Sequence, residues 1–94
     1  MPNPALDFTK VEALRKHMLL NTTQMSKFLG VSRVTYSGWT KGKPIRKGND
    51  AKVRIALRKM FVVIESHQWP MPEVIGMVPK DRFDTLLEMT KEEE

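Results

Sequence analysis

Only three residues, Gly30, Val31 and Ser32, separate two stretches whose apolar side chains recur at helical spacing. A left-handed residue at the end of a helix carries least strain when it has no Cβ atom, so Gly30 is suited to end the first helix. Ser32 is suited to cap the next helix, because its hydroxyl can accept a hydrogen bond from a free backbone N–H group. The sequence therefore predicts two helices joined by a tight turn.

Capping residues and helix breakers set the outer limits of this pair of helices. Asn21 and Gln24 have the spacing of a capping box, which predicts that the first helix begins near Thr22. The second helix is expected to end at residue 39 to 41, because Gly42 and Pro44 follow it. The whole pair thus spans about residues 21–41.

The rest of the chain also shows helical periodicity, without a long alternation of apolar and polar residues. An N-terminal helix is predicted by the spacing of Phe8, Val11, Leu14 and Met18. A long helix to about His67, capped by Asn49 or Asp50, is predicted by a core-facing stripe of Val53, Ala56, Leu57, Met60, Phe61 and Ile64. Two prolines within residues 69–72 break this helix, and residues 79–89 predict a last one. We expect a single all-α domain over residues 1–94, a compact bundle of about five helices.

Composition excludes several classes of function. The chain has no cysteine, and His17 and His67 stand far apart without partners, so we expect no metal site and no cofactor. No pair of carboxylates, histidine beside a nucleophile or phosphate-binding glycine loop is recognisable, so we expect neither an enzyme nor a small-molecule substrate. The longest apolar run, residues 60–64, is too short to cross a bilayer, and the first residues lack a signal-peptide pattern. We expect a cytoplasmic protein without membrane contact.

Charge is concentrated in one part of the chain, although the net charge is only +5. Residues 41–59 contain a single acidic residue, Asp50, and eight basic ones: Lys41, Lys43, Arg46, Lys47, Lys52, Arg54, Arg58 and Lys59. Acidic residues outnumber basic ones after residue 79, and we interpret the final Lys-Glu-Glu-Glu as a solvated surface. The density of positive charge in residues 41–59 indicates a polyanionic partner.

The pair of helices resembles the helix-turn-helix of the phage repressor and Cro family, with matches from Leu20 to Lys43. Members of that family have an apolar and then a small residue facing the second helix, here Met25 and Ser26. They continue with Leu-Gly-Val-Ser at the turn, here residues 29–32, and with an apolar residue and an aromatic three apart before a glycine stop. The resemblance implies a lambda-repressor-like fold and double-stranded DNA as the partner. It also implies a transcriptional regulator that occupies an operator in a bacterial or phage-infected cell.

The resemblance divides the motif into a core side and a DNA side. We assign seven residues to the motif core, namely Met25, Ser26, Leu29, Gly30, Val31, Tyr36 and Trp39. Stacking of Tyr36 or Trp39 on bases is the alternative interpretation. The opposite face of the second helix enters the major groove in the family, so we expect base reading by Arg33, Val34, Ser37 and Gly38.

The chemistry of these residues suits contact with DNA. The Arg33 guanidinium can donate two hydrogen bonds to guanine, with a phosphate contact as the alternative, and Val34 can pack on a thymine methyl group. Gly38 stands where relatives carry a long polar residue, which indicates either a close backbone approach or an early helix end. Phosphate contacts are expected from Thr22, Ser32, Thr35, Lys41, Lys43, Arg46 and Lys47.

Apolar residues left outside the core stripe of the long helix indicate a second copy. Ile55, Val62 and Val63 lie outside that stripe. We take Ile55 and Val62 as the candidate interface of a homodimer. The helices of about residues 50–90 are expected to complete the core and to provide this interface. Two other functions stay open. The motif also occurs in DNA-packaging or recombination accessory factors, and the basic residues could instead bind an acidic protein partner such as a host RNA polymerase surface.

Overall fold

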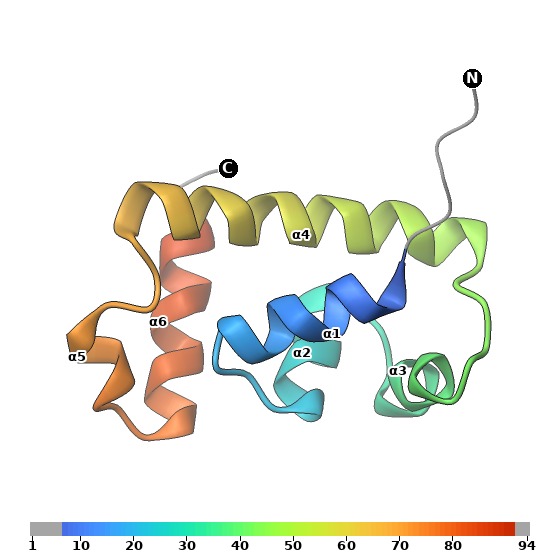
Figure 1. Ribbon diagram of the computed structural model, residues 1–94, viewed down its shortest axis with the longest axis horizontal. Coiled ribbons are helices and arrows are strands. Elements are labelled where there is room, and N and C mark those ends of the chain that lie inside the picture. The colour runs from blue at the N-terminus through green and yellow to red at the C-terminus, as the bar shows by residue number, and fades with distance from the viewer. Residues whose placement is uncertain (1–6, 92–94) are drawn as a thin grey trace.

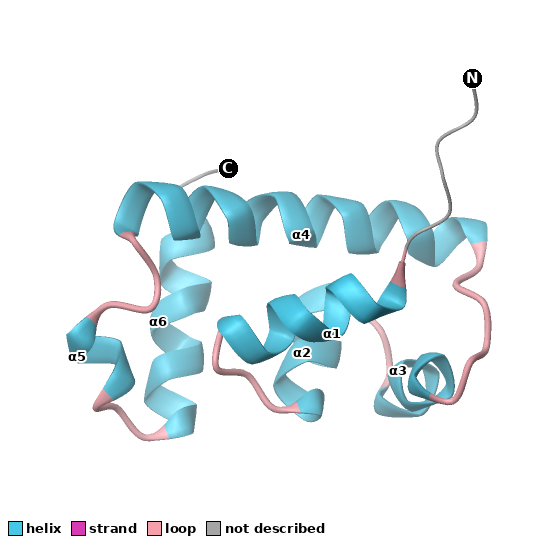
Figure 2. Ribbon diagram, in the orientation of Figure 1, coloured by secondary structure: helices cyan, strands magenta, loops and turns pink. Residues whose placement is uncertain are grey.

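The computed structural model describes residues 7–91, which form six α-helices and no strand (Figure 1, Figure 2). The all-α prediction is therefore confirmed. The helix that the sequence did not predict is α5, which has only four residues and begins at Pro72. The helices are α1 (Phe8–His17), α2 (Thr22–Leu29), α3 (Arg33–Thr40), α4 (Lys47–His67), α5 (Pro72–Ile75) and α6 (Pro79–Lys91).

Helix α4 spans the length of the molecule, and the other helices lie on one side of it (Figure 1). With 21 residues it is about 32 Å long at 1.5 Å per residue. Helix α3 lies near one end of α4, whereas α5 lies near the other end (Figure 1). Helix α3 is thus separated from α5 by most of the length of the bundle, whereas α2 lies beside α6, where the Gln24 side chain donates to the Pro79 carbonyl (3.1 Å).

The caps of α2 and α3 agree with the sequence expectations. The Asn21 side chain accepts a hydrogen bond from the Gln24 backbone N–H (2.7 Å), and the Gln24 side chain accepts one from the Asn21 N–H (3.1 Å). Gly30 ends α2 with a φ of +78°, a left-handed conformation that favours glycine. Ser32 Oγ accepts a hydrogen bond from Thr35 N–H (3.0 Å) and caps α3. The predicted tight turn is therefore confirmed.

Helix α4 begins earlier than its predicted caps. Its first residue is Lys47 and its N-cap is Arg46, which makes no side-chain capping bond, so the assignment of the cap to Asn49 or Asp50 was wrong. The backbone N–H groups of Asn49 and Asp50 both donate to the Arg46 carbonyl (3.0 and 2.8 Å), which places them in the first turn. The Asp50 carboxylate instead pairs with Arg54 one turn later (2.5 Å).

The core-facing side of α4 also differs from its predicted stripe. Phe61 is 53% exposed, whereas Val63, predicted to lie outside the core, is fully buried. The buried residues of α4 are Val53, Ala56, Met60 and Val63, spaced by three and four. Phe61 follows Met60 directly, so it lies about 100° around the helix from Met60 and outside this stripe. The wrong predictions for Phe61 and Val63 have the same cause, because the core lies on a slightly different side of α4 than the sequence predicts.

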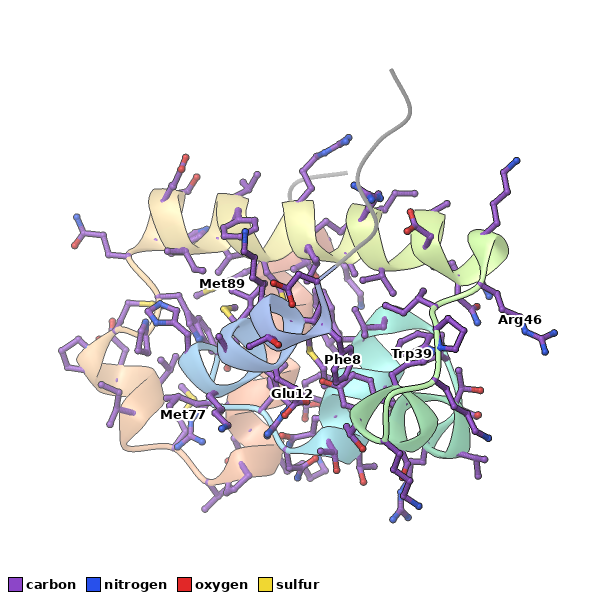
Figure 3. All side chains as sticks on the ribbon, turned by 45° about the vertical axis from the view of Figure 1, so that its right-hand side comes forward. Phe8, Glu12, Trp39, Arg46, Met77 and Met89 are labelled. Atoms are coloured by element: carbon purple, nitrogen blue, oxygen red, sulfur yellow. The ribbon has the colours of Figure 1, made fainter. Side chains whose placement is uncertain are left out.

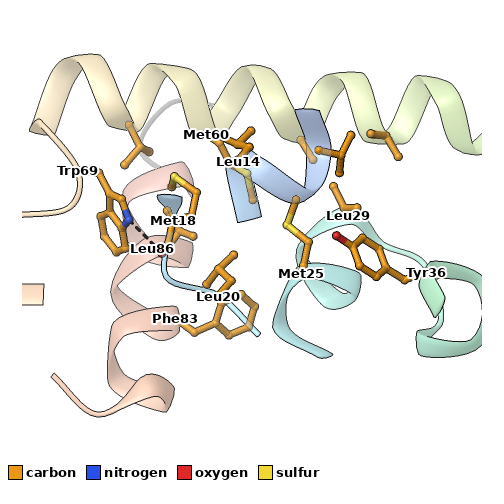
Figure 4. Close-up of a cluster of buried hydrophobic side chains, with 14 of the residues drawn as sticks. Leu14, Met18, Leu20, Met25, Leu29, Tyr36, Met60, Trp69, Phe83 and Leu86 are labelled. Atoms are coloured by element: carbon orange, nitrogen blue, oxygen red, sulfur yellow. Dashed lines mark hydrogen bonds between the residues drawn. The ribbon is translucent and has the colours of Figure 1, made fainter. Parts of the chain in front are cut away.

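The hydrophobic core is closed at the C-terminal end of α4 by Trp69 (Figure 4). The Trp69 indole N–H donates to the Met18 carbonyl at the end of α1 (3.1 Å), so this buried polar group is satisfied. Methionine fills irregular space well because its side chain is unbranched, and Met18, Met25 and Met60 all lie in the centre of the core. The residues after α4 therefore belong to the same core as α1 and α2.

Arg82 of α6 donates hydrogen bonds to several backbone carbonyls outside its own helix. Its guanidinium donates to the carbonyls of Val74 (2.8 Å), Ile75 (3.1 Å) and Met77 (2.8 Å), at the end of α5 and just after it. It also approaches the carbonyl of Leu19 (3.5 Å), between α1 and α2. Carbonyls at a helix end have no partner within the helix. One side chain thus joins α5 and the α1–α2 connection to α6.

We expect Arg82→Lys to lower the free energy of unfolding by about 1–3 kcal/mol, because an ammonium group cannot reach these carbonyls together. Urea denaturation followed by circular dichroism measures this change. The matched control is Lys80→Arg at an exposed position of the same helix, which should change stability by less than about 0.5 kcal/mol. Equal stability of Arg82→Lys and the wild-type chain would show that the guanidinium contacts contribute nothing net.

Candidate nucleic-acid interface

Helix α3 presents different chemistry on its two sides. Tyr36 and Trp39 face the bundle and are buried. Arg33 and Ser37 are exposed, and Val34 is 82% exposed. Residues three and four apart share one side of a helix. The outer side therefore offers a guanidinium, an aliphatic group and a hydroxyl within about one turn of helix.

An aromatic cluster anchors the inner side of α3 to α1 (Figure 3). The Phe8 ring lies edge-on to Tyr36 and Trp39, with centroid distances of 5.3 and 6.1 Å, and the Tyr36 and Trp39 centroids are 5.9 Å apart. These distances are typical of favourable aromatic pairs. Rings that are buried in this way have no face free for a base, so the geometry favours the core assignment of both residues over base stacking.

Glu12 of α1 adds a polar contact to this cluster. Its carboxylate accepts a hydrogen bond from the Tyr36 hydroxyl (2.5 Å) and two from the Arg15 guanidinium (3.1 and 2.9 Å). The hydrogen bond from Arg15 lowers the pKa of the Glu12 carboxyl, and burial raises the pKa of the Tyr36 hydroxyl. Sequence reasoning missed Glu12. The spacing of Glu12 and Arg15 is visible in the sequence, but nothing there indicates the contact with Tyr36, 24 residues away.

The turn between α2 and α3 is closely packed. Ser26 is buried and its hydroxyl donates to the Thr23 carbonyl (2.7 Å), while its own carbonyl accepts from Val31 N–H (3.0 Å). The predicted core residues Met25 and Leu29 are buried, and Val31 is half-buried. The Ser32 hydroxyl donates to Thr35 Oγ1 (2.9 Å), so these two predicted phosphate contacts bind each other.

Residues of α2, α3 and the following loop line a concavity with a volume of about 550 Å³. We call it the α3 surface. It is lined by Thr22, Arg33, Val34, Tyr36, Ser37, Gly38, Thr40, Lys41 and Lys43. Three of these side chains are cationic and none is acidic, so the α3 surface carries a positive potential.

Four of the seven predicted phosphate contacts lie outside the α3 surface. Arg46 and Lys47 are exposed at the start of α4. Figure 3 shows Arg46 extending outward from the bundle. Ser32 and Thr35 do not line the concavity either. The structure thus brings together Thr22, Lys41 and Lys43 with the base-reading candidates, while the other four predicted phosphate contacts do not line this concavity.

Gly38 departs from the predicted base-reading set, because it is buried. A Cβ atom at this position would lie 3.0 Å from the Lys43 side chain, which crosses the helix there. The Gly38 carbonyl accepts hydrogen bonds from the N–H groups of Lys41 (3.1 Å) and Lys43 (3.0 Å). The glycine therefore allows the chain after α3 to fold back closely. Of the two interpretations left open by the sequence, the structure favours the close approach.

The remaining basic residues lie on α4, away from the α3 surface. Arg54 pairs with Asp50, and Lys52 and Lys59 line a second groove. The apolar residues proposed for dimer contact differ in exposure, because Ile55 is 55% exposed and Val62 is half-buried. The charge that is continuous in the sequence is therefore divided between two surfaces.

No family model, curated protein or solved structure matches this chain. Within residues 7–91, no helix is long and apolar enough to span a membrane, and no group of His, Cys, Asp or Glu side chains could hold a metal ion. The functional interpretation therefore depends on the geometry and charge of the α3 surface.

The lowered pKa of Glu12 makes stability depend on pH. A carboxyl whose pKa lies below its unfolded value of 4.5 stabilises the fold above that value, and this contribution is lost as the pH falls through the folded pKa. We expect Glu12→Gln to lose less melting temperature than the wild-type chain between about pH 6 and about pH 3. Thermal denaturation at each pH measures this difference.

The control for this experiment is Glu65→Gln, at an exposed position of α4. It should keep the acid dependence of the wild-type chain. If Glu12→Gln keeps that dependence as well, other carboxyls cause the acid sensitivity, and the hydrogen bonds of Glu12 with Arg15 and Tyr36 have no role in it.

Proposed function

We propose that this chain is a sequence-specific double-stranded DNA-binding protein, in which α2 and α3 act as a helix-turn-helix of the phage repressor and Cro type. The observation that carries the proposal is the α3 surface. It gathers exposed hydrogen-bonding and apolar groups of one short helix among three cationic side chains. The protein acts by occupying an operator as a transcriptional regulator in a bacterial or phage-infected cell.

The dimensions of α3 suit the major groove. An α-helix with its side chains is about 10–12 Å in diameter, and the major groove of B-form DNA is about 12 Å wide. Recognition helices contact base edges mainly through their N-terminal residues. Arg33 and Val34 are the first two residues of α3, and Ser37 follows one turn later. Arg33 reads a guanine, and the other two adjust the contact with neighbouring bases.

The residues around α3 bind the sugar-phosphate backbone. Thr22 begins α2, where free backbone N–H groups and the helix dipole favour an anion. Lys41 and Lys43 follow the C-terminal end of α3. Together with Thr22 at the start of α2, they contact phosphates on the two sides of the groove. Arg46 and Lys47 extend this positive charge to the start of α4. Contacts of this kind fix the register of the protein without reading sequence.

An in-vitro selection of bound duplexes from a random library tests the proposal directly. We expect a consensus sequence to emerge, with two inverted half-sites about one helical turn apart if the protein binds as a homodimer. A selection that yields no consensus, with equal affinity for all duplexes, would leave only non-specific binding by the basic residues.

Base reading and phosphate binding should separate in two substitutions. Arg33→Ala is expected to cost about 1–3 kcal/mol on the selected site and to relax the preference at one base pair. Lys41→Ala should weaken binding to all duplexes and lower the salt slope by about one. Fluorescence anisotropy over a range of salt concentrations measures both effects.

The matched control for Arg33→Ala is Arg58→Ala, which removes an exposed arginine from α4. It should leave the sequence preference unchanged. If Arg33→Ala weakens selected and random duplexes equally, Arg33 binds phosphate and the assignment of base reading is wrong.

The outer side of α4 is the proposed dimer interface. A two-fold contact uses the same residues of both copies, so Val62→Glu introduces two charges into it. We expect this substitution to dissociate the dimer and to weaken binding to a two-half-site duplex far more than to a single half-site.

Sedimentation velocity measures association, and circular dichroism checks the fold because Val62 is half-buried. Ser66→Glu, an exposed position one turn later, is the control. A wild-type chain that sediments as a monomer, free and on DNA, would contradict the dimer.

A further inference from the structure

A second groove lies between α2, α4 and α6, with a volume of about 370 Å³. We call it the α4 groove. Its floor includes Phe28 of α2, Ile55 of α4 and Leu87 of α6. Phe28 and Leu87 are half-buried against the core, and Ile55 is 55% exposed. Three helices thus leave an accessible apolar surface at the place where they meet.

Lysines surround this apolar floor. Lys27, Lys52 and Lys59 all line the α4 groove, whereas no acidic side chain does. Lys27 and Lys52 are exposed. An apolar surface bordered by charges of one sign favours a ligand that has apolar groups in its centre and opposite charges around them.

The α4 groove and the α3 surface share no lining residue. They meet opposite ends of α2, because Thr22 at its start belongs to the α3 surface and Phe28 near its end to the α4 groove. A ligand in the α4 groove therefore leaves the outer side of α3 uncovered. An inference about this groove does not depend on DNA binding by α3.

The C-terminal acidic residues of the chain do not suit the α4 groove. The acidic residues 92–94 are three glutamates in succession, so this segment has no apolar side chain for the floor. Three carboxylates within residues 7–91, those of Asp50, Asp84 and Glu88, each pair with a basic residue of their own helix. Nucleic acid could use the lysines, but its phosphate backbone has no group to cover Phe28 and Ile55.

We propose that the α4 groove binds an acidic amphipathic helix of a partner protein. Such a helix places apolar residues three and four positions apart on one side, which matches the apolar floor of a groove. Its aspartate and glutamate side chains then lie at the edges of the contact, beside Lys27 and Lys52. The apolar contact provides affinity, and the lysines select an acidic partner over a basic one.

A labelled synthetic peptide tests this proposal on the full chain. The probe is a helix-forming peptide with leucine at positions i, i+3, i+4 and i+7 and glutamate at most others. A version with lysine in place of each glutamate, and a scrambled version of the same composition, serve as controls. Fluorescence anisotropy measures affinity, and amide chemical shifts in nitrogen-15 spectra locate the peptide on the chain. We expect only the acidic amphipathic peptide to bind, with shifts around Phe28, Ile55 and Leu87.

Two double substitutions with the same change of net charge give the matched comparison. Lys27→Glu with Lys52→Glu should weaken the peptide by about tenfold or more, whereas Lys10→Glu with Lys16→Glu on α1 should have little effect. Equal loss in both variants, shifts at Arg33 and Ser37, or no binding of the acidic peptide would overturn the proposal. Stronger peptide binding by Val62→Glu would also overturn it, because a second copy would then be the natural occupant.

Discussion

The contact of Tyr36 with α1 determines where the outer side of α3 points. A helix of eight residues has little stability of its own, so α3 depends on tertiary contacts for its position. Tyr36 provides two of them, a ring packed against Phe8 and a hydroxyl bound to Glu12. Trp39 adds a third contact on the same side. Residues on the outer side of α3 are therefore oriented by the buried side chains of Tyr36 and Trp39 on its inner side.

Glu12 of α1 helps to hold α3 in place through hydrogen bonds. The carboxylate receives hydrogen bonds from two side chains of different helices, and Arg15 in turn donates to the Leu20 carbonyl (2.9 Å). A series of hydrogen bonds beside the aromatic cluster thus connects α3 to α1, and α1 to the segment before α2. Charge-assisted hydrogen bonds are stronger and more directional than neutral ones. The relative positions of α2 and α3 are consequently fixed by α1 as well as by their own turn.

Local chemistry was predictable from the sequence, and contacts between distant residues were not. The capping box at Asn21 and the left-handed Gly30 follow from the requirements of a few neighbouring residues, so these features were read correctly. The start of α4 was misplaced because Asn49 and Asp50 are good caps that the structure uses within the helix. The choice between Phe61 and Val63 depends on the direction from which other helices cover α4, which periodicity fixes only to within about one residue.

The candidate site shows the same division. The outer residues Arg33, Val34 and Ser37 could be selected from helical spacing alone, once the limits of α3 were known. The burial of Gly38 could not, because it depends on the path of Lys43 after the helix has ended. The separation of the basic residues into two surfaces also needed the fold. Residues 41–43 lie beside α3, whereas α4 directs Lys52 and Lys59 toward another groove.

If both surfaces bind as proposed, α2 is the element that connects them. Thr22 and Leu29 are seven residues apart, which corresponds to about 10 Å along the helix. This distance is comparable to the Debye length of about 8 Å at physiological ionic strength, so carboxylates in the α4 groove have little electrostatic effect on phosphates at the start of α2. A stronger coupling would need two conformations of α2 to which the ligands bind differently. The capping box and the Gly30 turn hold both ends of α2 in one conformation, so the two ligands should bind almost independently.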